Sequence, residues 1–265
     1  MRLIQLTKLS LRKKLIFSFL AMLLIPTLLI GIISYQSAEK QISKEQQTST
    51  TESIRMLNTN ITSTIKPKIE DIQYFTKKLN QSYLQESKVP ELKSLFKEYV
   101  NMHPEIELVY FGTSEGKILD EPAQQYQNDF DPRTRPWYTQ AVNNKGQVAI
   151  TAPYISQGTG DMVITITQAL PDNSGVIGLD LNISTLSAIT NDIRIGKTGF
   201  ASLLDDNKLY ISQRGKESGS EATESYISKI YEQDSGTIIE ADRQLQFITN
   251  ELTGWKLVGT MFSAE

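Results

Sequence analysis

Residues 130–138 read Phe-Asp-Pro-Arg-Thr-Arg-Pro-Trp-Tyr and are the most informative segment of this 265-residue chain. Two prolines restrict the backbone of the loop, and Asp131 can cap a turn within it. A guanidinium such as that of Arg135 pairs with a carboxylate through two parallel hydrogen bonds, and the indole N–H of Trp137 is a further donor. Arginine also stacks on tryptophan, and both residue types are enriched at protein interfaces. The composition of the loop is therefore as typical of a structural anchor as of a binding site for an anionic group.

Strands and turns are predicted on both sides of this loop. Segments read as strands, by their β-branched content and flanking turn residues, are 106–111, 118–119, 148–155, 162–170 and 175–183. After a predicted helix at 184–193 the same order recurs at smaller size, with strands at 199–204, 209–211, 237–241, 244–249 and 255–262 and a helix near 226–231. This order predicts an α+β fold with two tandem α/β units, although no strict sequence repeat is present.

Asp180 lies in the predicted strand 175–183, where the isoleucines and leucines share one face because side chains alternate. It therefore shares the opposite face with Gly178, which is expected to leave open space beside the carboxylate. A buried charge needs a partner. That partner can be the ammonium group of a ligand, the side chain of Arg133 or Arg135, or water at the edge of the sheet.

A long amphipathic helix is predicted before the first strand. Apolar residues recur every three or four positions in two runs, Ile54, Leu57, Ile61, Ile65 and then Ile72, Phe75, Leu79, Tyr83. Pro67 falls between the two runs and is expected to kink or restart the helix. A second helix is predicted at residues 90–100, before the first strand begins.

An uncharged and almost wholly apolar segment covers residues 15–38. A helix of this length spans about 36 Å, against about 30 Å for a hydrocarbon core, and exceeds the apolar region of a signal peptide. Residues 1–14 carry basic and no acidic side chains. We therefore predict one membrane-spanning helix in the cell membrane, with a cytoplasmic N-terminus and residues 39–265 outside, a cleaved signal peptide being the alternative.

The composition excludes several classes of function. The chain has no cysteine, one histidine and a net charge of −3, so thiol nucleophiles, zinc or iron–sulfur sites and nucleic-acid binding are not expected. No metal site and no cofactor is predicted, and His103 is interpreted as a surface residue. Asp205-Asp206-Asn207 is interpreted as a turn rather than a calcium loop. An exported hydrolase remains an alternative, but a catalytic triad would depend on the single histidine and no Gly-x-Ser-x-Gly motif is present.

Residues 131–138, together with the order of basic N-terminus, apolar span, long helix and tandem α/β units, resemble the double Cache sensor domain of bacterial methyl-accepting chemotaxis proteins. The segments 150–154 (Ile-Thr-Ala-Pro-Tyr) and 252–256 (Leu-Thr-Gly-Trp-Lys) extend the resemblance. Sensor histidine kinases and diguanylate cyclases carry similar domains, and the closing Thr-Gly-Trp-Lys segment favours the chemoreceptor branch. The resemblance implies a binding module rather than an enzyme.

The resemblance also implies a domain organisation. The expected parts are a cytoplasmic segment 1–14, a span 15–38, a helical stalk 39–104, a membrane-distal PAS-like unit 105–185 that binds ligand, and a membrane-proximal PAS-like unit 186–265. A small-molecule ligand, often a free amino acid, and homodimers through the long helices are expected. A receptor of this kind would continue beyond Glu265 with a second span and an output domain, so the sequence is expected to be an excised piece or a truncated gene product.

Matched position by position, the resemblance implies roles for individual residues of the distal unit. Arg135 and Trp137 would hold the carboxylate of a ligand. Tyr138 and Asp180 would meet its ammonium group, and Tyr154 would line the pocket.

The chain departs from the amino-acid-binding subset of the family at two positions. Phe130 stands where that subset usually has tyrosine, and Ser156 stands where it often has an acid. The first removes a hydroxyl contact, and both weaken the polar anchoring of the ligand. A less common amino acid, another carboxylate or an indirectly bound ligand therefore stays open.

Overall fold

The computed structural model describes residues 10–262, apart from the side chain of Leu84. Arg2 and Lys8 of the predicted basic segment lie outside this range. Helix α1 (Leu11–Lys78) contains the apolar segment and, among the described residues, is the one helix long and apolar enough to cross a membrane. Its most apolar window has a mean hydropathy of 2.6, and none of that window is buried. A separate compact unit begins at Thr50 and includes all the strands.

Helix α1 runs through Pro67 without a break, so of the two outcomes expected there, a kink or a restart, the restart is wrong. Proline removes one backbone hydrogen bond of a helix and crowds the preceding turn. Ile65 before it and Ile72 after it are fully buried. We infer that packing on both sides of Pro67 outweighs the missing hydrogen bond and keeps the segment helical.

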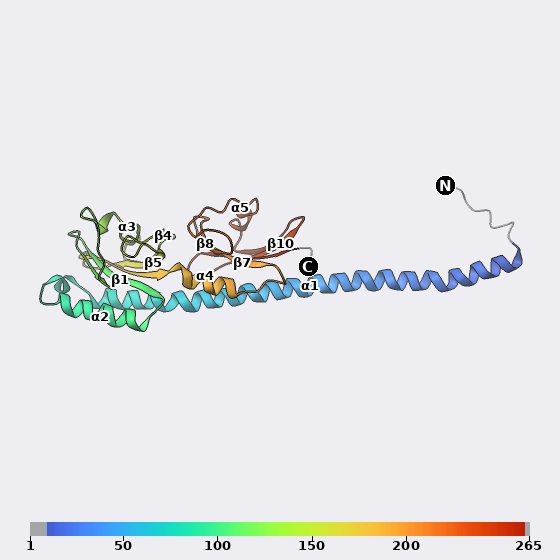
Figure 1. Ribbon diagram of the computed structural model, residues 1–265, viewed down its shortest axis with the longest axis horizontal. Coiled ribbons are helices and arrows are strands. Elements are labelled where there is room, and N and C mark those ends of the chain that lie inside the picture. Colours follow the sequence, from blue (N-terminus) through green and yellow to red (C-terminus); the bar gives the residue numbers. More distant parts are fainter. Residues whose placement is uncertain (1–9, 263–265) are drawn as a thin grey trace. The chain divides into compact units, whose positions relative to one another are not determined.

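The buried stripe of α1 forms one side of the main core, as its spacing predicted. The stripe includes Ile54, Leu57, Ile61, Ile65, Ile72 and Phe75. These residues share one continuous cluster with helix α2 (Val89–Met102) and with apolar residues of both sheets. Figure 1 shows this part of α1 along one face of the sheets, while α3 (Pro136–Asn143) and α5 (Ile227–Ile230) lie on the opposite face. A single helix therefore packs against both sheets.

The first sheet is antiparallel and has the order β2-β1-β6-β5-β3, with β4 paired to β5. Its strands are β1 (Ile106–Thr113), β2 (Ile118–Glu121), β3 (Ala149–Ile150), β4 (Tyr154–Ile155), β5 (Met162–Ala169) and β6 (Gly175–Asn182). The short helix η3 (Pro132–Thr134) lies in the connection from β2 to β3, and η2 (Gln81–Leu84) lies between α1 and α2. The predicted strand 148–155 is thus two short strands, because Pro153 between them has no N–H to donate to a ladder.

The second sheet is also antiparallel and has the order β8-β7-β11-β10-β9. Helix α4 (Ile183–Asp192) leads into it, and its strands are β7 (Phe200–Leu204), β8 (Tyr210–Gln213), β9 (Ser235–Ile239), β10 (Arg243–Thr249) and β11 (Lys256–Phe262). Asp205 closes the β7–β8 turn by accepting the backbone N–H of Asn207, as expected for a turn. The predicted α+β fold, with a long N-terminal helix and two tandem antiparallel sheets, is confirmed.

His103 lies in a half-buried charged cluster, so its interpretation as a plain surface residue is wrong. Its Nδ1 is 2.8 Å from Nζ of Lys68 and 3.3 Å from a carboxylate oxygen of Glu105. Lys68 in turn pairs with Glu105 at 2.7 Å. Burial alone would raise the pKa of Glu105, but the hydrogen bond and charge of Lys68 outweigh it and bring that pKa below its usual value. The cluster ties α1 to the start of β1.

Replacing Lys68 by Met is expected to lower the free energy of unfolding by about 2 kcal/mol, because it leaves Glu105 partly buried without its cation. The lysine side chain is only 4% exposed, whereas Glu105 is 26% exposed and retains some solvent. Thermal unfolding of the detergent-solubilised chain measures the effect. Lys66→Met, at an exposed position of the same helix, is the control and should change little. Equal melting temperatures for the two variants would contradict the assigned role of Lys68.

Candidate functional site

The candidate site lies on the face of the first sheet that is turned away from α1. Side chains alternate along β1, so Val109 and Phe111 enter the main core while Leu108 and Tyr110 point to the other face. There they form a small cluster with residues of α3, including Trp137. The site is therefore built from the central strands of the sheet and the loop that enters α3.

Asp180 is the polar centre of this face. It lies on β6 between β1 and β5 and is 1% exposed. Its Oδ1 accepts hydrogen bonds from the hydroxyls of Tyr110 and Thr165, both at 2.6 Å, and a longer one from Tyr154 at 3.4 Å. Its Oδ2 accepts from Ser156 at 3.2 Å. Four hydroxyl groups thus surround one carboxylate.

The carboxylate has hydrogen bonds but no opposite charge. No basic side chain among residues 10–262 forms an ion pair with Asp180, and Arg133, one of its anticipated partners, pairs with Asp131 at 2.8 Å instead. Burial raises the pKa of Asp180 to about 6, although the hydroxyls of Thr165, Tyr110 and Ser156 favour the charged form. Burial also raises the pKa of Tyr110 well above its usual value, so Tyr110 remains a donor at neutral pH.

Residues 130–138 contribute three further lining residues, Phe130, Arg135 and Trp137. The Asp131 side chain caps η3 by accepting the backbone N–H of Arg133, as expected for this loop. Pro136 then starts α3 at its first position. Trp137 follows and is held against β1, where a Cβ on Gly112 would come within 2.4 Å of the indole ring. Its ring centroid is 4.6 Å from that of Tyr110.

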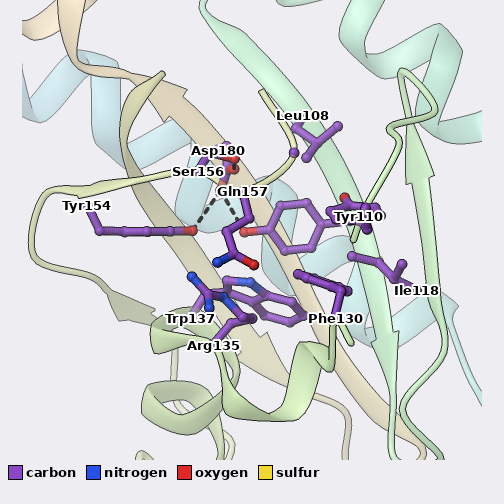
Figure 2. Close-up of a pocket in the computed structure, with 12 residues that line it drawn as sticks. Leu108, Tyr110, Ile118, Phe130, Arg135, Trp137, Tyr154, Ser156, Gln157 and Asp180 are labelled. Atoms are coloured by element: carbon purple, nitrogen blue, oxygen red, sulfur yellow. Dashed lines mark hydrogen bonds between the residues drawn. The ribbon is translucent and has the colours of Figure 1, made fainter. Parts of the chain in front are cut away.

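Arg135 supplies the positive charge of the site. Figure 2 shows its side chain beside Trp137, on the side of the cavity opposite Asp180. Within the described part of the chain its guanidinium forms no ion pair. The cavity therefore has a free cation at one side and an unneutralised carboxylate at the other, an arrangement that is complementary to a zwitterion.

The structure brings together six of the seven residues that the sequence singled out. Phe130, Arg135, Trp137, Tyr154, Ser156 and Asp180 line the cavity. Tyr138 is the exception: it is buried against Trp137, with ring centroids 5.5 Å apart, and does not line the cavity. Successive side chains of a helix point in different directions, so Trp137 of α3 faces the cavity and Tyr138 does not.

Six lining residues were missed by the sequence analysis: Leu108, Tyr110, Ile118, Tyr126, Gln157 and Gly158. The alternation of Leu108 and Tyr110 along a predicted strand could have identified these two. No comparable signal marks Gln157, because it lies in the loop between β4 and β5, outside any strand alternation. The open space expected beside Gly178 is absent, since that glycine faces Tyr110 across the β1–β6 ladder and an added Cβ would lie 2.4 Å from the ring.

Comparisons with known proteins agree with this geometry. The family model described as Cache domain, of the double Cache type, matches residues 34–265. The methyl-accepting chemotaxis protein McpB of Bacillus subtilis is 35% identical over 98% of this chain, and TlpB of the same organism is 34% identical over 97%. This chain spans about two fifths of the length of these relatives, 40% of McpB and 39% of TlpB.

Solved structures confirm the fold. The ligand-binding domain of Pseudomonas fluorescens chemoreceptor CtaA, in complex with L-isoleucine, superimposes with a TM-score of 0.69 at 21% identity, covering 86% of this chain and 96% of that one. The ligand-binding domain of Pseudomonas aeruginosa PctB, in complex with L-Arg, gives a TM-score of 0.64 at 20% identity over 80% and 93%. Because the family model covers most of the sequence and several relatives exceed 30% identity, this chain belongs to the Cache domain family, in the double Cache form found among methyl-accepting chemotaxis proteins.

Proposed function

We propose that this chain is the sensor part of a chemoreceptor and that its distal cavity binds a small amino acid or a related zwitterionic carboxylate. The single observation that carries the proposal is that Arg135 and Asp180, neither of which has an ion-pair partner among the described residues, lie on opposite sides of one cavity. Arg135 and the indole N–H of Trp137 would hold the ligand carboxylate. The ammonium group would neutralise Asp180, and Tyr154 would contribute its hydroxyl.

Signalling follows from the same proposal. α1 is the proposed membrane span, with its basic N-terminal end in the cytoplasm and the sheets outside. Its buried stripe belongs to the same core cluster as the strands that carry the site. A ligand changes output only if it binds two conformations with different affinity, so occupancy would be transmitted as a shift of α1 against the sheets. We further propose a homodimer through α1.

We propose a binding role and not a catalytic one. In support, the curated relatives are methyl-accepting chemotaxis proteins, which also favour chemoreceptor output over the kinase and cyclase alternatives. The acidic centre of the cavity offers one carboxylate surrounded by hydroxyls, not the paired carboxylates that glycoside hydrolysis requires.

Replacing Arg135 by Ala is expected to reduce strongly the thermal stabilisation of the detergent-solubilised chain by its amino-acid ligand. A thermal-shift screen of the twenty amino acids and common organic acids on the unaltered chain first identifies the ligand. The variant should then lose at least about tenfold in affinity, because one charge-assisted contact is removed.

Arg133→Ala is the matched control, since Arg133 pairs with Asp131 at the protein surface and does not line the cavity. Its ligand-induced shift should match that of the unaltered chain. An undiminished shift in the Arg135 variant would reject the proposed carboxylate contact.

A further inference from the structure

The loop between β4 and β5 contributes Ser156, Gln157 and Gly158 to the lining of the candidate site. Its base is closed by two backbone hydrogen bonds, from Ser156 N–H to Asp161 O and from Gly160 N–H to Ser156 O, both 2.8 Å long. Gln157 lies near its tip, between Ser156 and Gly158. Figure 2 shows the Gln157 side chain extending across the cavity toward Arg135 and Trp137.

The space left under this side chain is small. The cavity volume is about 20 Å³, which accommodates about one water molecule. Pockets that enclose small organic ligands measure about 300–1,000 Å³. A zwitterion that contacts both Arg135 and Asp180 therefore requires one wall of the cavity to move.

The other walls resist such a movement. Tyr110, Trp137 and Asp180 are each less than 5% exposed and are locked by ring contacts and hydrogen bonds. Gln157 differs from them, because it is the one exposed residue among the twelve described residues that line the cavity. Its carboxamide forms no hydrogen bond with another described residue. Gly158 follows it and has no side chain that would restrict the rotation of Gln157.

We propose that Gln157 is the gate and size-selectivity residue of this site: its side chain occupies volume that the ligand's own side chain needs, and this side chain swings out when ligand binds, while Ser156 stays hydrogen-bonded to Asp180. This inference rests on the proposed function. Moving Gln157 costs free energy, and this cost makes the observed binding free energy less favourable, because only the displaced conformation is competent to bind. The penalty grows with the size of the ligand side chain.

Truncation of Gln157 therefore has a distinctive expected result. In Gln157→Ala, calorimetric titration should show affinity rising by about tenfold for L-leucine and L-isoleucine, as expected when a gate that is open about a tenth of the time is removed. Affinity for glycine should also rise, but by less than for leucine, because a smaller displacement of Gln157 admits it. Gln157→Glu, which keeps the size and adds a negative charge near the ligand carboxylate, should weaken binding of every amino acid. Gln125→Ala is the control, because Gln125 is exposed on the neighbouring loop and does not line the cavity.

Weaker binding in Gln157→Ala, or the same change for glycine and leucine, would overturn the gate and make Gln157 a direct contact or a bystander. A second measurement separates this failure from failure of the proposed function. In a Trp255→Phe background, acrylamide quenching of Trp137 fluorescence should rise about twofold when Gln157 is truncated. If no amino acid binds any variant but quenching rises, the proposed function fails and the gate stands; unchanged quenching overturns the gate.

Discussion

Replacing Asp180 by Asn is expected to abolish amino-acid binding and, at the same time, to raise the melting temperature of the protein. Asp180 is the only acidic residue that lines the cavity in the described part of the chain, so the variant removes the partner of the ligand ammonium. Breaking a buried charge pair of this kind lowers affinity by about 100-fold or more, since it costs about 3–5 kcal/mol. Isothermal titration of the detergent-solubilised chain measures the loss.

The gain in stability has a separate physical reason. The pKa of Asp180 in the folded protein is about 6, above the value of about 3.9 for an unfolded chain. The folded protein therefore binds more protons than the unfolded chain between about pH 4 and 6, and the free energy of unfolding falls as pH rises through this window. Above about pH 6 Asp180 is charged in the folded protein, and its burial then lowers the free energy of unfolding by about 3 kcal/mol at most.

Asparagine relieves this penalty while preserving the hydrogen bonds. Its carbonyl oxygen can still accept from Tyr110 and Thr165, and its amide can donate to the hydroxyl of Ser156. We expect a gain of about 1–2 kcal/mol at pH 7.5 and none near pH 4, where Asp180 is already neutral. Thermal unfolding across pH 4–8 tests both statements.

Affinity in the unaltered protein should fall as pH drops below about 6, because protonation removes the charge that the ligand ammonium needs. Asp129→Asn, at an exposed position outside the cavity, is the control and should alter neither property. Retained affinity in Asp180→Asn would exclude an ammonium group as its partner. A lower melting temperature would show that the carboxylate is neutralised by a group other than a ligand.

The sequence predicted those features of the site that depend on local periodicity. Strict alternation placed Asp180 on the face opposite the core side chains of β6, and the structure agrees. Proline and aspartate chemistry correctly predicted a turn capped by Asp131 within 130–138. The amphipathic spacing of α1 predicted its buried stripe. Each of these features is determined by residues close together in the sequence, within a few helical turns or along one strand.

Features that depend on distant pairing could not be predicted. Tyr110 donates to Asp180 from 70 positions away in the sequence, and only the register of β1 against β6 brings its ring over Gly178. Because the strand register was unknown, the sequence analysis expected open space beside Gly178, where the structure has the Tyr110 ring. The family resemblance assigned Tyr138 to the site, but Trp137 and Tyr138 are neighbours on helix α3, where successive side chains point in different directions, and Tyr138 does not line the cavity. The continuity of α1 through Pro67 likewise depends on packing with distant strands.

Replacing Gly178 by Ala is expected to destabilise the protein by about 3 kcal/mol or more and to disrupt the site. An added Cβ would lie 2.4 Å from Cε2 and 2.7 Å from Cζ of Tyr110, well inside van der Waals contact. The Tyr110 ring is 2% exposed and fixed by its 2.6 Å hydrogen bond to Asp180. The ring cannot move aside without breaking that bond, so the variant combines overpacking with an unsatisfied buried hydroxyl.

A double-mutant cycle distinguishes this specific clash from a general loss of β6 stability. Tyr110→Ala alone should also destabilise, because it leaves a cavity in place of a buried ring. In the double variant the added methyl group has room, so the two losses should not add, and the coupling free energy should be about 1–3 kcal/mol in the favourable direction. Strictly additive losses in thermal or denaturant unfolding would show that the close contact of Tyr110 with Gly178 does not fix the geometry around Asp180. A strong coupling would instead establish that this pair of facing residues holds the acidic centre of the site in position.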